Sequence, residues 1–219
     1  MRTLYHTPLS PACRKVRMLL KEKDLLFELE VENYWERRED FNPACDVPVL
    51  VDEGGDLVSG PYAICEYLEE KYPERNLIGA SIEERREVRR LISWFDEKFL
   101  YEVTLNLLHE KVFKRLMGYG TPNSEAIRAG KANISYHLDY IAHLTRKQGW
   151  LAAERMTLAD LTAAAHLSCL DYMGDVDWQS HPEVHTWYAI IKSRPCFRPL
   201  LTDRISGMKP APHYENLDF

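Results

Sequence analysis

Residues 47–73, VPVLVDEGGDLVSGPYAICEYLEEKYP, decide the fold class of the N-terminal part of this chain. Two short apolar runs stand on either side of Gly54-Gly55, and a glycine pair between such runs is typical of a tight hairpin turn. Pro61 then opens a helical pattern, and proline is favoured at the first position of a helix. The stretch therefore predicts a hairpin followed at once by a helix that ends near Tyr72.

The sequence before this hairpin predicts a strand, a helix and a second strand. Residues 2–7, RTLYHT, and 26–32, LFELEVE, alternate between apolar and polar residues, as half-buried strands do. Between them, Ser10 followed by Pro11 is a typical helix start, and the helical pattern continues to about Lys23. The order strand, helix, strand, strand, strand, helix predicts a small α/β domain.

The second half of the chain has a helical pattern. A capping box at Ser81 opens one long predicted helix over 81–117, and a second helix is expected over about 123–147. Thr157 and Asp160 form another capping box before LTAAAHLSCL, which is apolar on all sides and typical of the centre of a helical bundle. The predicted organisation has four parts: an α/β domain (1–72), a linker (73–80), an all-helical domain (81–201) and an extended tail (202–219).

The composition is that of an ordinary globular protein. The 219 residues are 45% hydrophobic and 28% charged, with a net charge of -6 and no block of Lys and Arg that could neutralise nucleic-acid phosphates. No apolar run approaches the roughly 20 residues of a membrane helix, and the N-terminus lacks the features of a signal peptide. We therefore expect a cytoplasmic protein that neither binds nucleic acid nor inserts into a membrane.

The cysteines are odd in number and include no CxxC pair, which argues against both a disulfide framework and a zinc site. They are Cys13, Cys45, Cys65, Cys169 and Cys196. We expect reduced and mostly buried thiols, and we expect neither a metal nor a cofactor.

A family resemblance rests on four segments: SPACRKVR (10–17), Val47-Pro48, AICEYLEEKYP (63–73) and TLADLTAAAHL (157–167). Together they make residues 2–200 resemble the cytosolic glutathione transferases. The resemblance implies an α/β plus all-α fold, with a thioredoxin-like N-terminal domain and an all-helical C-terminal domain. It also implies a cis Val47-Pro48 bond and a homodimer.

The resemblance assigns glutathione contacts to three residues. Ser10 matches the serine that holds the glutathione thiolate at a helix N-terminus, although its role as a helix cap explains this serine equally well. Val47 and Pro48 match the segment whose backbone pairs with the cysteinyl part of glutathione. On this interpretation the protein is a glutathione transferase that conjugates glutathione to a small electrophile. Cys13, one turn into the helix, is expected to be buried and not nucleophilic.

Two departures from the family pattern argue against glutathione binding. In the family, an acidic residue and a serine precede the third helix and hold the γ-glutamyl end of glutathione, whereas this chain has Gly60 and Pro61. Loss of a charge pair and a hydroxyl is expected to weaken binding by about two to four powers of ten. Cys45 also replaces the glycine that is usual in the preceding loop. We therefore expect glutathione to bind very weakly or not at all.

A narrower resemblance involves five further segments. They are WERREDF (35–41), HEKVFKRL (109–116), HLSCLDYMGDVDW (166–178), KSRPCFRPLL (192–201) and HYENLDF (213–219). They are similar to those of an alphaproteobacterial group of transferase-like proteins that localise with the division protein FtsZ. This resemblance implies a non-enzymatic protein at the division site that binds FtsZ, bends its filaments and promotes constriction with the septal wall-synthesis machinery.

Two regions are predicted to contact partners. Tyr34 and Trp35, beside Glu36 and Arg37, combine aromatic and charged side chains as interface hot spots do, although one ring could instead pack onto the domain interface. The second region is the tail, whose proline-rich start favours docking in an extended form. Its predicted contacts are His213, Tyr214, Leu217, Asp218 and Phe219. The structural alternative is a tail that folds back over the helical domain.

Overall fold

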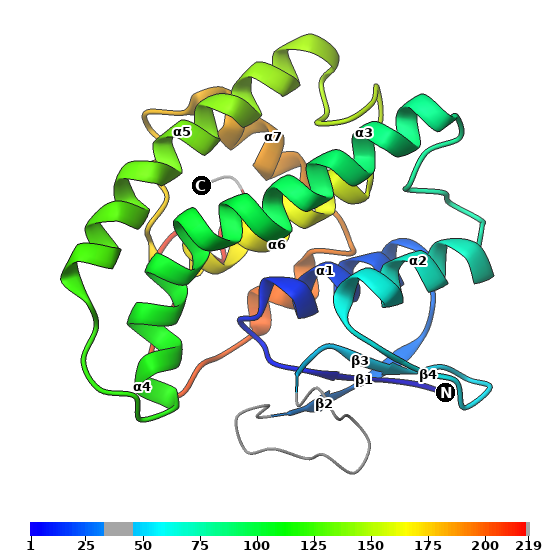
Figure 1. The fold of residues 1–219 in the computed structure, drawn as a ribbon, viewed down its shortest axis with the longest axis horizontal. Coiled ribbons are helices and arrows are strands. Elements are labelled where there is room, and N and C mark those ends of the chain that lie inside the picture. Colours follow the sequence, from blue (N-terminus) through cyan, green and yellow to red (C-terminus); the bar gives the residue numbers. More distant parts are fainter. Residues whose placement is uncertain (33–45, 218–219) are drawn as a thin grey trace. The chain divides into compact units, whose positions relative to one another are not determined.

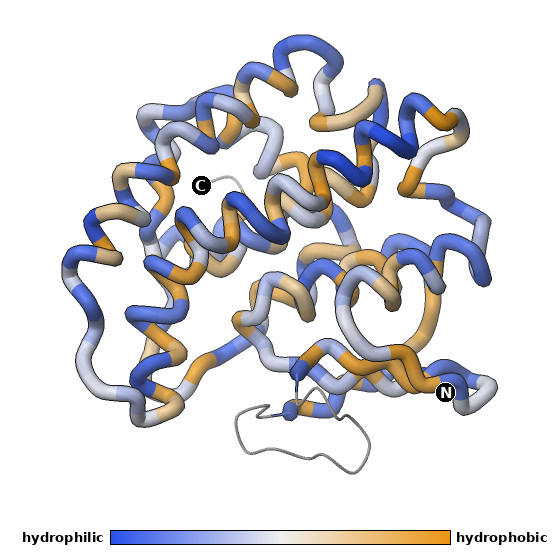
Figure 2. Tube along the Cα trace, viewed as in Figure 1, coloured by the Kyte–Doolittle hydropathy of each residue, from blue (hydrophilic) through white to orange (hydrophobic). Residues whose placement is uncertain are grey.

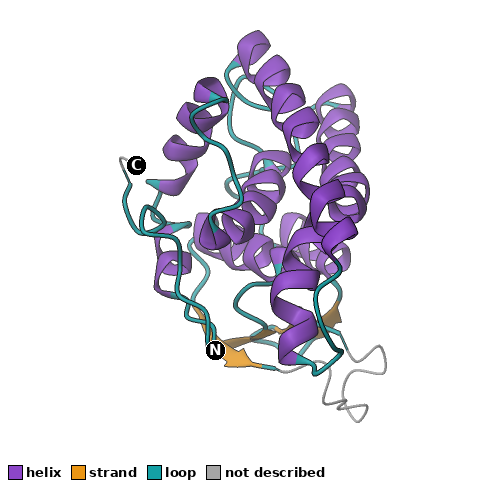
Figure 3. Cartoon of the chain, turned by 90° about the vertical axis from the view of Figure 1, so that its left-hand side faces the viewer, coloured by secondary structure: helices purple, strands orange, loops and turns teal. Residues whose placement is uncertain are grey.

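The computed structural model describes residues 1–32 and 46–217. The chain divides into two compact units whose segments alternate: residues 1–77 with 194–209, and residues 78–193 with the chain from Pro210 onward. The four strands of the sheet belong to the first unit, and Figure 3 shows them in orange. The chain therefore returns once to each unit after leaving it.

The first unit contains a thioredoxin-like sheet. Its elements are β1 (Arg2–His6), α1 (Pro11–Glu22), β2 (Phe27–Val31), β3 (Val49–Val51), β4 (Leu57–Ser59), α2 (Pro61–Lys71) and, from the later segment, the 3₁₀-helix η3 (Arg198–Thr202). The strand order is β2-β1-β3-β4, with β1 and β2 parallel and the other neighbours antiparallel. The predicted order of elements and the predicted hairpin are confirmed.

Local sequence explains where the helices of this unit begin. The Ser10 hydroxyl caps α1, and Pro11 takes the first helical position, as predicted. α2 also has a proline at its first position, after β4, but Gly60 before it provides no side-chain cap. The two helices pack side by side over the sheet (Figure 1). The Val47-Pro48 bond that precedes β3 is cis, as expected.

Ion pairs explain why residues 194–209 belong to the first unit. Asp203 lies 2.8 Å from the Arg17 guanidinium on α1, and Arg194 pairs with Glu22 at the end of the same helix. The boundary that we expected between the helical domain and the tail therefore falls inside a segment that packs with the α/β unit. Hydropathy could not indicate this, because the pairing joins residues that are far apart in the sequence.

The second unit is helical. Its elements are α3 (Ile82–Ser93), η2 (Trp94–Phe113), α4 (Lys114–Leu116), α5 (Ser124–Gln148), α6 (Leu158–Met173) and α7 (Pro182–Lys192). The first three form the long helix predicted over 81–117, and its first turns are strongly hydrophilic (Figure 2, blue). However, η2 is a π-helix, at whose end the Lys114 N–H donates to the His109 carbonyl, five residues back. The sequence pattern did not predict this widening.

α6 is the buried centre of the helical unit, as its apolar sequence predicts. Every residue of the helix except the last is buried. The predicted capping box is present, because the Asp160 carboxylate accepts the Thr157 N–H at 2.8 Å while the Thr157 side chain caps the helix. Asp160 also accepts the Leu151 N–H and the Trp187 indole N–H, both at 3.0 Å. One carboxylate thus joins the helix start to the preceding loop and to α7.

Candidate functional site

Ser10 serves as the cap of α1. Its backbone N–H donates to the Thr7 carbonyl at 3.1 Å, and its hydroxyl accepts the Cys13 N–H at 3.3 Å. A hydroxyl that accepts one hydrogen bond still has a proton to donate, so capping and thiolate binding are compatible at this position. The geometry of Ser10 therefore does not distinguish a structural from a catalytic role.

Cys13 is a core residue, as expected. Its side chain is wholly buried, and its sulfur accepts the Thr7 N–H at 3.4 Å. Burial raises the pKa of the Cys13 thiol to about 12, so the thiol is protonated at neutral pH and is a poor nucleophile. The cysteines within the described ranges are all free and buried.

The Val47-Pro48 segment is bonded to groups of its own chain. The Val47 N–H donates to Asp46 Oδ1 at 2.8 Å, and the Pro48 carbonyl accepts the Gly60 N–H at 3.1 Å. The backbone of Val47 is the group that is expected to pair with the cysteinyl part of glutathione. An incoming ligand would therefore compete with the Asp46 carboxylate for the Val47 N–H.

Gly60 and Pro61 begin α2 without a side-chain cap. Gly60 has φ of 89°, a left-handed conformation that favours glycine. A Cβ atom built on Gly60 meets nothing within 4 Å, so crowding does not explain the missing side chain. Pro61 has neither an N–H nor a hydroxyl to offer. This helix start thus lacks the carboxylate and the hydroxyl by which the family pattern holds the γ-glutamyl group.

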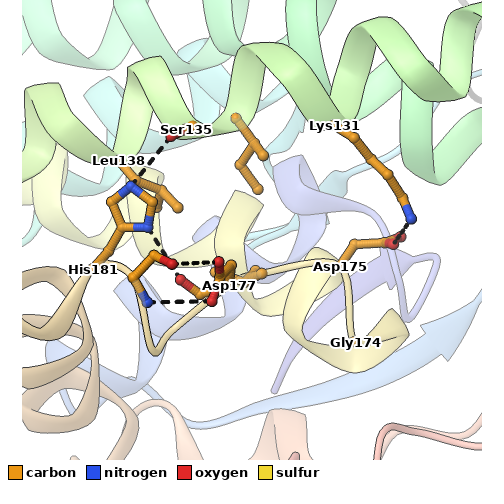
Figure 4. Close-up of a pocket in the computed structure, with 10 residues that line it drawn as sticks. Lys131, Ser135, Leu138, Gly174, Asp175, Asp177 and His181 are labelled. Atoms are coloured by element: carbon orange, nitrogen blue, oxygen red, sulfur yellow. Dashed lines mark hydrogen bonds and ion pairs between the residues drawn. The ribbon is translucent and has the colours of Figure 1, made fainter.

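The helical unit has a pocket of about 380 Å³ between α5 and the turn that joins α6 to α7 (Figure 4). Its apolar lining residues are Ile134, Leu138 and Val176. On its polar side, His181 Nε2 lies 3.4 Å from the Ser135 hydroxyl, and Lys131 Nζ lies 4.0 Å from Asp175. Because these polar groups bond to one another, the pocket does not present a converging set of reactive groups.

Residues 1–32 and 46–217 contain neither a candidate metal site nor a candidate membrane-spanning helix. No three His, Cys, Asp or Glu side chains there are grouped so that they could hold a metal ion. The helices of the same ranges are too short or too polar to cross a membrane.

The C-terminal segment folds back onto the helical unit. This is the alternative to a partner-binding tail that the sequence left open. Tyr214 is wholly buried, and its ring centroid lies 5.1 Å from that of Tyr172. In this structure the Tyr214 ring is used inside the chain, and its contact with a partner stays a prediction. His213 Nε2 lies 2.8 Å from Asp171, and Leu217 is half-buried.

Several predicted contacts lie outside the described residues. They are Tyr34, Trp35, Glu36, Arg37, Asp218 and Phe219, together with the departure at Cys45. Their roles stay predictions.

Sequence reasoning missed a buried ionic cluster around Asp171. This carboxylate lies near the end of α6 and pairs with Lys192 at the end of α7 at 3.2 Å, although both side chains are wholly buried. The available signal was an acid near the end of a helix that is otherwise apolar on all sides beyond its first turn, since buried charges require partners. The identity of the partner could not be read from the pattern.

Comparison with known proteins agrees with this architecture. Residues 4–76 match the glutathione S-transferase N-terminal domain, and residues 104–195 match the glutathione S-transferase C-terminal domain. The crystal structure of a glutathione S-transferase from Rhodospirillum rubrum F11 matches 100% of both chains, with a TM-score of 0.98 and 53% identity. The fold and these matches define a protein of the glutathione transferase class.

Two further relatives narrow the assignment. FtsZ-localized protein A of Caulobacter vibrioides is 48% identical, and the alignment covers 100% of this chain and 98% of that protein. The structure of FzlA from C. crescentus matches 100% of this chain and 99% of its own, with a TM-score of 0.96 and 47% identity. The chain therefore belongs to the glutathione S-transferase superfamily, among its members that are similar to FtsZ-localized protein A.

Proposed function

We propose that this protein is a non-enzymatic, glutathione-transferase-like cell-division protein that binds FtsZ filaments. In this role it changes the curvature of the filaments and promotes constriction with the septal wall-synthesis machinery, in the cytoplasm at the division site. The observation that carries the proposal is the 48% identity to FtsZ-localized protein A along the whole chain.

The ligand site of the first unit supports a role other than glutathione conjugation. Gly60 and Pro61 offer neither a carboxylate nor a hydroxyl, and the Val47 N–H already donates to Asp46. Each charge-assisted hydrogen bond that is lost costs about 1.5–3 kcal/mol, so glutathione would be held weakly. A fold can be kept as a scaffold after its ancestral site has degraded.

The proposed FtsZ contact includes Trp35 with its neighbours Tyr34, Glu36 and Arg37. An aromatic side chain surrounded by charges has the composition of an interface hot spot. A homodimer would present this surface twice, and two linked contacts on one filament provide a physical means of bending or crosslinking it.

The alternative function is a glutathione transferase in which Ser10 holds the glutathione thiolate. Its support is the 53% identity to a protein described as a glutathione S-transferase, together with the position of the Ser10 hydroxyl at the start of α1. Glutathione would then be a substrate. This function requires glutathione to bind despite Gly60 and Pro61.

Co-sedimentation with polymerised FtsZ tests the proposal directly. The wild-type protein is expected to pellet with the filaments, and Trp35→Ala is expected to stay in the supernatant while keeping the wild-type melting temperature. Tyr119→Ala is a matched control, because Tyr119 is 64% exposed in the helical unit and is not part of the proposed contact. Electron microscopy of the pelleted filaments should show curved polymers, and straight, unaltered filaments would contradict the role in curvature.

Calorimetric titration with reduced glutathione separates the two functions. No heat up to millimolar glutathione, together with pelleting by FtsZ, is the result expected of the proposed division protein. Micromolar binding of glutathione without pelleting would favour the transferase, and a screen of small electrophiles with wild type and Ser10→Ala would follow.

A further inference from the structure

The C-terminal segment meets the helical unit through its backbone and one ring. The Ala211 N–H donates to the Tyr172 carbonyl at 2.8 Å, and the Tyr214 N–H donates to the Ala211 carbonyl at 2.9 Å, which turns the chain. The buried Tyr214 ring stands edge-on to the Tyr172 ring, at an interplanar angle of 70°. A backbone hydrogen bond beside a pocket for a side chain is also how many proteins hold short peptides.

A buried ion pair lies next to this ring. Lys192 Nζ is 3.2 Å from Asp171 Oδ2, and neither side chain is exposed. The helical unit supplies two further donors to the acid, the Trp178 indole N–H at 2.9 Å and the Tyr188 hydroxyl at 3.2 Å. Burial lowers the pKa of the Lys192 ammonium, while the Asp171 charge opposes this shift. An ion pair in such surroundings is stable only when both charges are well surrounded by partners.

The C-terminal segment provides partners for both charges. His213 Nε2 lies 2.8 Å from Asp171 Oδ1, and the His213 carbonyl accepts the Lys192 ammonium at 3.5 Å. The same ammonium lies 5.6 Å from the centre of the Tyr214 ring, within the range of a cation–π contact. His213 and Tyr214 together thus contact both charges of the ion pair, Asp171 on α6 and Lys192 on α7.

The segment also has the properties of a separable ligand. Pro210 and Pro212 restrict its backbone before docking, which reduces the entropy that is lost on binding. Residues 210–217 contain no helix or strand, and residues 194–209 before them belong to the other unit. The segment can therefore leave its place without unwinding any helix of the described chain.

We propose that Asp171, Tyr172, Tyr188 and Lys192 form a peptide-binding socket that the chain fills with its own C-terminal segment. The ligand of this socket is a peptide with adjacent His and Tyr residues after a proline, bound in the turn that the Tyr214 N–H closes on the Ala211 carbonyl. The attached segment excludes free peptides because a short tether holds it at an effective concentration on the order of millimolar. This inference does not depend on binding to FtsZ.

Fluorescence anisotropy with a labelled peptide of residues 209–217 tests the socket on full-length protein. Tyr214→Ala removes the ring of the attached segment and leaves the socket intact, so the peptide is expected to bind this variant at least about tenfold more tightly than wild type. A peptide with alanine in place of His213 and Tyr214 is expected not to bind. Full-length Tyr119→Ala, which lacks an exposed ring elsewhere, should behave like wild type.

Two further measurements keep the test decisive. His213→Ala replaces Tyr214→Ala if the latter does not fold, because it weakens the attached segment without emptying the ring site. Hydrogen exchange of the Ala211 N–H in wild type should be faster than that of the α6 amides, since the segment is expected to open alone. Equal weak binding of the peptide to wild type and variants, or exchange of Ala211 only at the rate of the α6 amides, would overturn the proposal. The segment would then be a permanent part of the core.

Discussion

The Pro48 carbonyl accepts the N–H of Gly60 at 3.1 Å, so the cis-proline segment is bonded directly to the start of α2. The two backbone segments that are expected to hold glutathione, Val47-Pro48 and Gly60-Pro61, are therefore held next to each other by a hydrogen bond. What the site lacks is side-chain chemistry at the helix start, where Pro61 follows a glycine. Substitutions at the start of α2 can therefore restore the missing groups one at a time, and glutathione binding can be measured after each.

Pro61→Ser is expected to raise the affinity for glutathione by about tenfold to a hundredfold, because one hydrogen bond to a charged group contributes about 1.5–3 kcal/mol. Calorimetry measures the change. Pro61→Ala is the matched control, since it restores the backbone N–H without the hydroxyl and should give a smaller gain. The same affinity for all three proteins would mean that Pro61 does not limit binding.

Ser10→Ala is expected to lower the free energy of unfolding by about 1 kcal/mol, because the Cys13 N–H loses its cap. Urea denaturation measures this loss. Ser10→Asn should recover most of the stability, since asparagine is an equally good cap. Binding to FtsZ filaments should be unchanged in both variants, and its loss in a folded Ser10→Ala protein would contradict a purely structural role.

Asp160→Ala is expected to destabilise the helical unit by at least about 3 kcal/mol, since several buried donors lose their acceptor at once. The donors are the backbone N–H groups of Leu151 and Thr157, the Thr157 hydroxyl and the Trp187 indole. Thermal and urea unfolding followed by circular dichroism measure the effect. Asp139→Ala on α5, whose side chain is 73% exposed, should change the stability by less than about 0.5 kcal/mol.

Mild acid is expected to destabilise the first unit through His6. Burial, reinforced by the nearby Arg17 charge, lowers the pKa of the His6 imidazole from 6.5 to about 4. Between these values the unfolded chain binds a proton at this residue and the folded chain does not. The free energy of unfolding should therefore fall by about 3 kcal/mol in total as the pH drops from 6.5 to 4.

Urea denaturation between pH 7.5 and 4.5 measures this dependence. His6→Phe keeps an apolar ring at the position and should remove the His6 share of this dependence. A smaller dependence should remain, because burial also lowers the pKa of the His137 imidazole on α5. An unchanged slope in the variant would assign the acid sensitivity to other groups.

The sequence predicted those features whose signals are local. The cap at Ser10, the hairpin at Gly54-Gly55 and the capping box at Thr157 each depend on a few consecutive residues, and all three are present. The apolar pattern of α6 likewise identified the centre of the helical unit. At the ligand site, the absence of a carboxylate and a hydroxyl at the start of α2 could be read directly from the residue types.

The remaining features depend on residues that meet only after folding. Asp171 finds Lys192 and His213, which follow it by 21 and 42 residues, and no spacing rule connects them. The π-helix η2 also has no local signal, because its apolar residues recur at a spacing that predicts an ordinary α-helix. The buried Tyr214 was predicted as an external anchor for the same reason, since an aromatic residue in a tail has no local signal that tells burial from exposure.

The alternating path of the chain limits how this protein can be recombined. A chimera that joins residues 1–77 to the remainder of a relative would provide α1 with a foreign partner segment, and it would keep the Arg17 contact only if an acid stood at the position of Asp203. Arg194 and Glu22 impose a second such condition. Relatives that differ at one member of these pairs are therefore expected to differ at the other, so substitutions at positions 17 and 203, and at positions 22 and 194, should occur together.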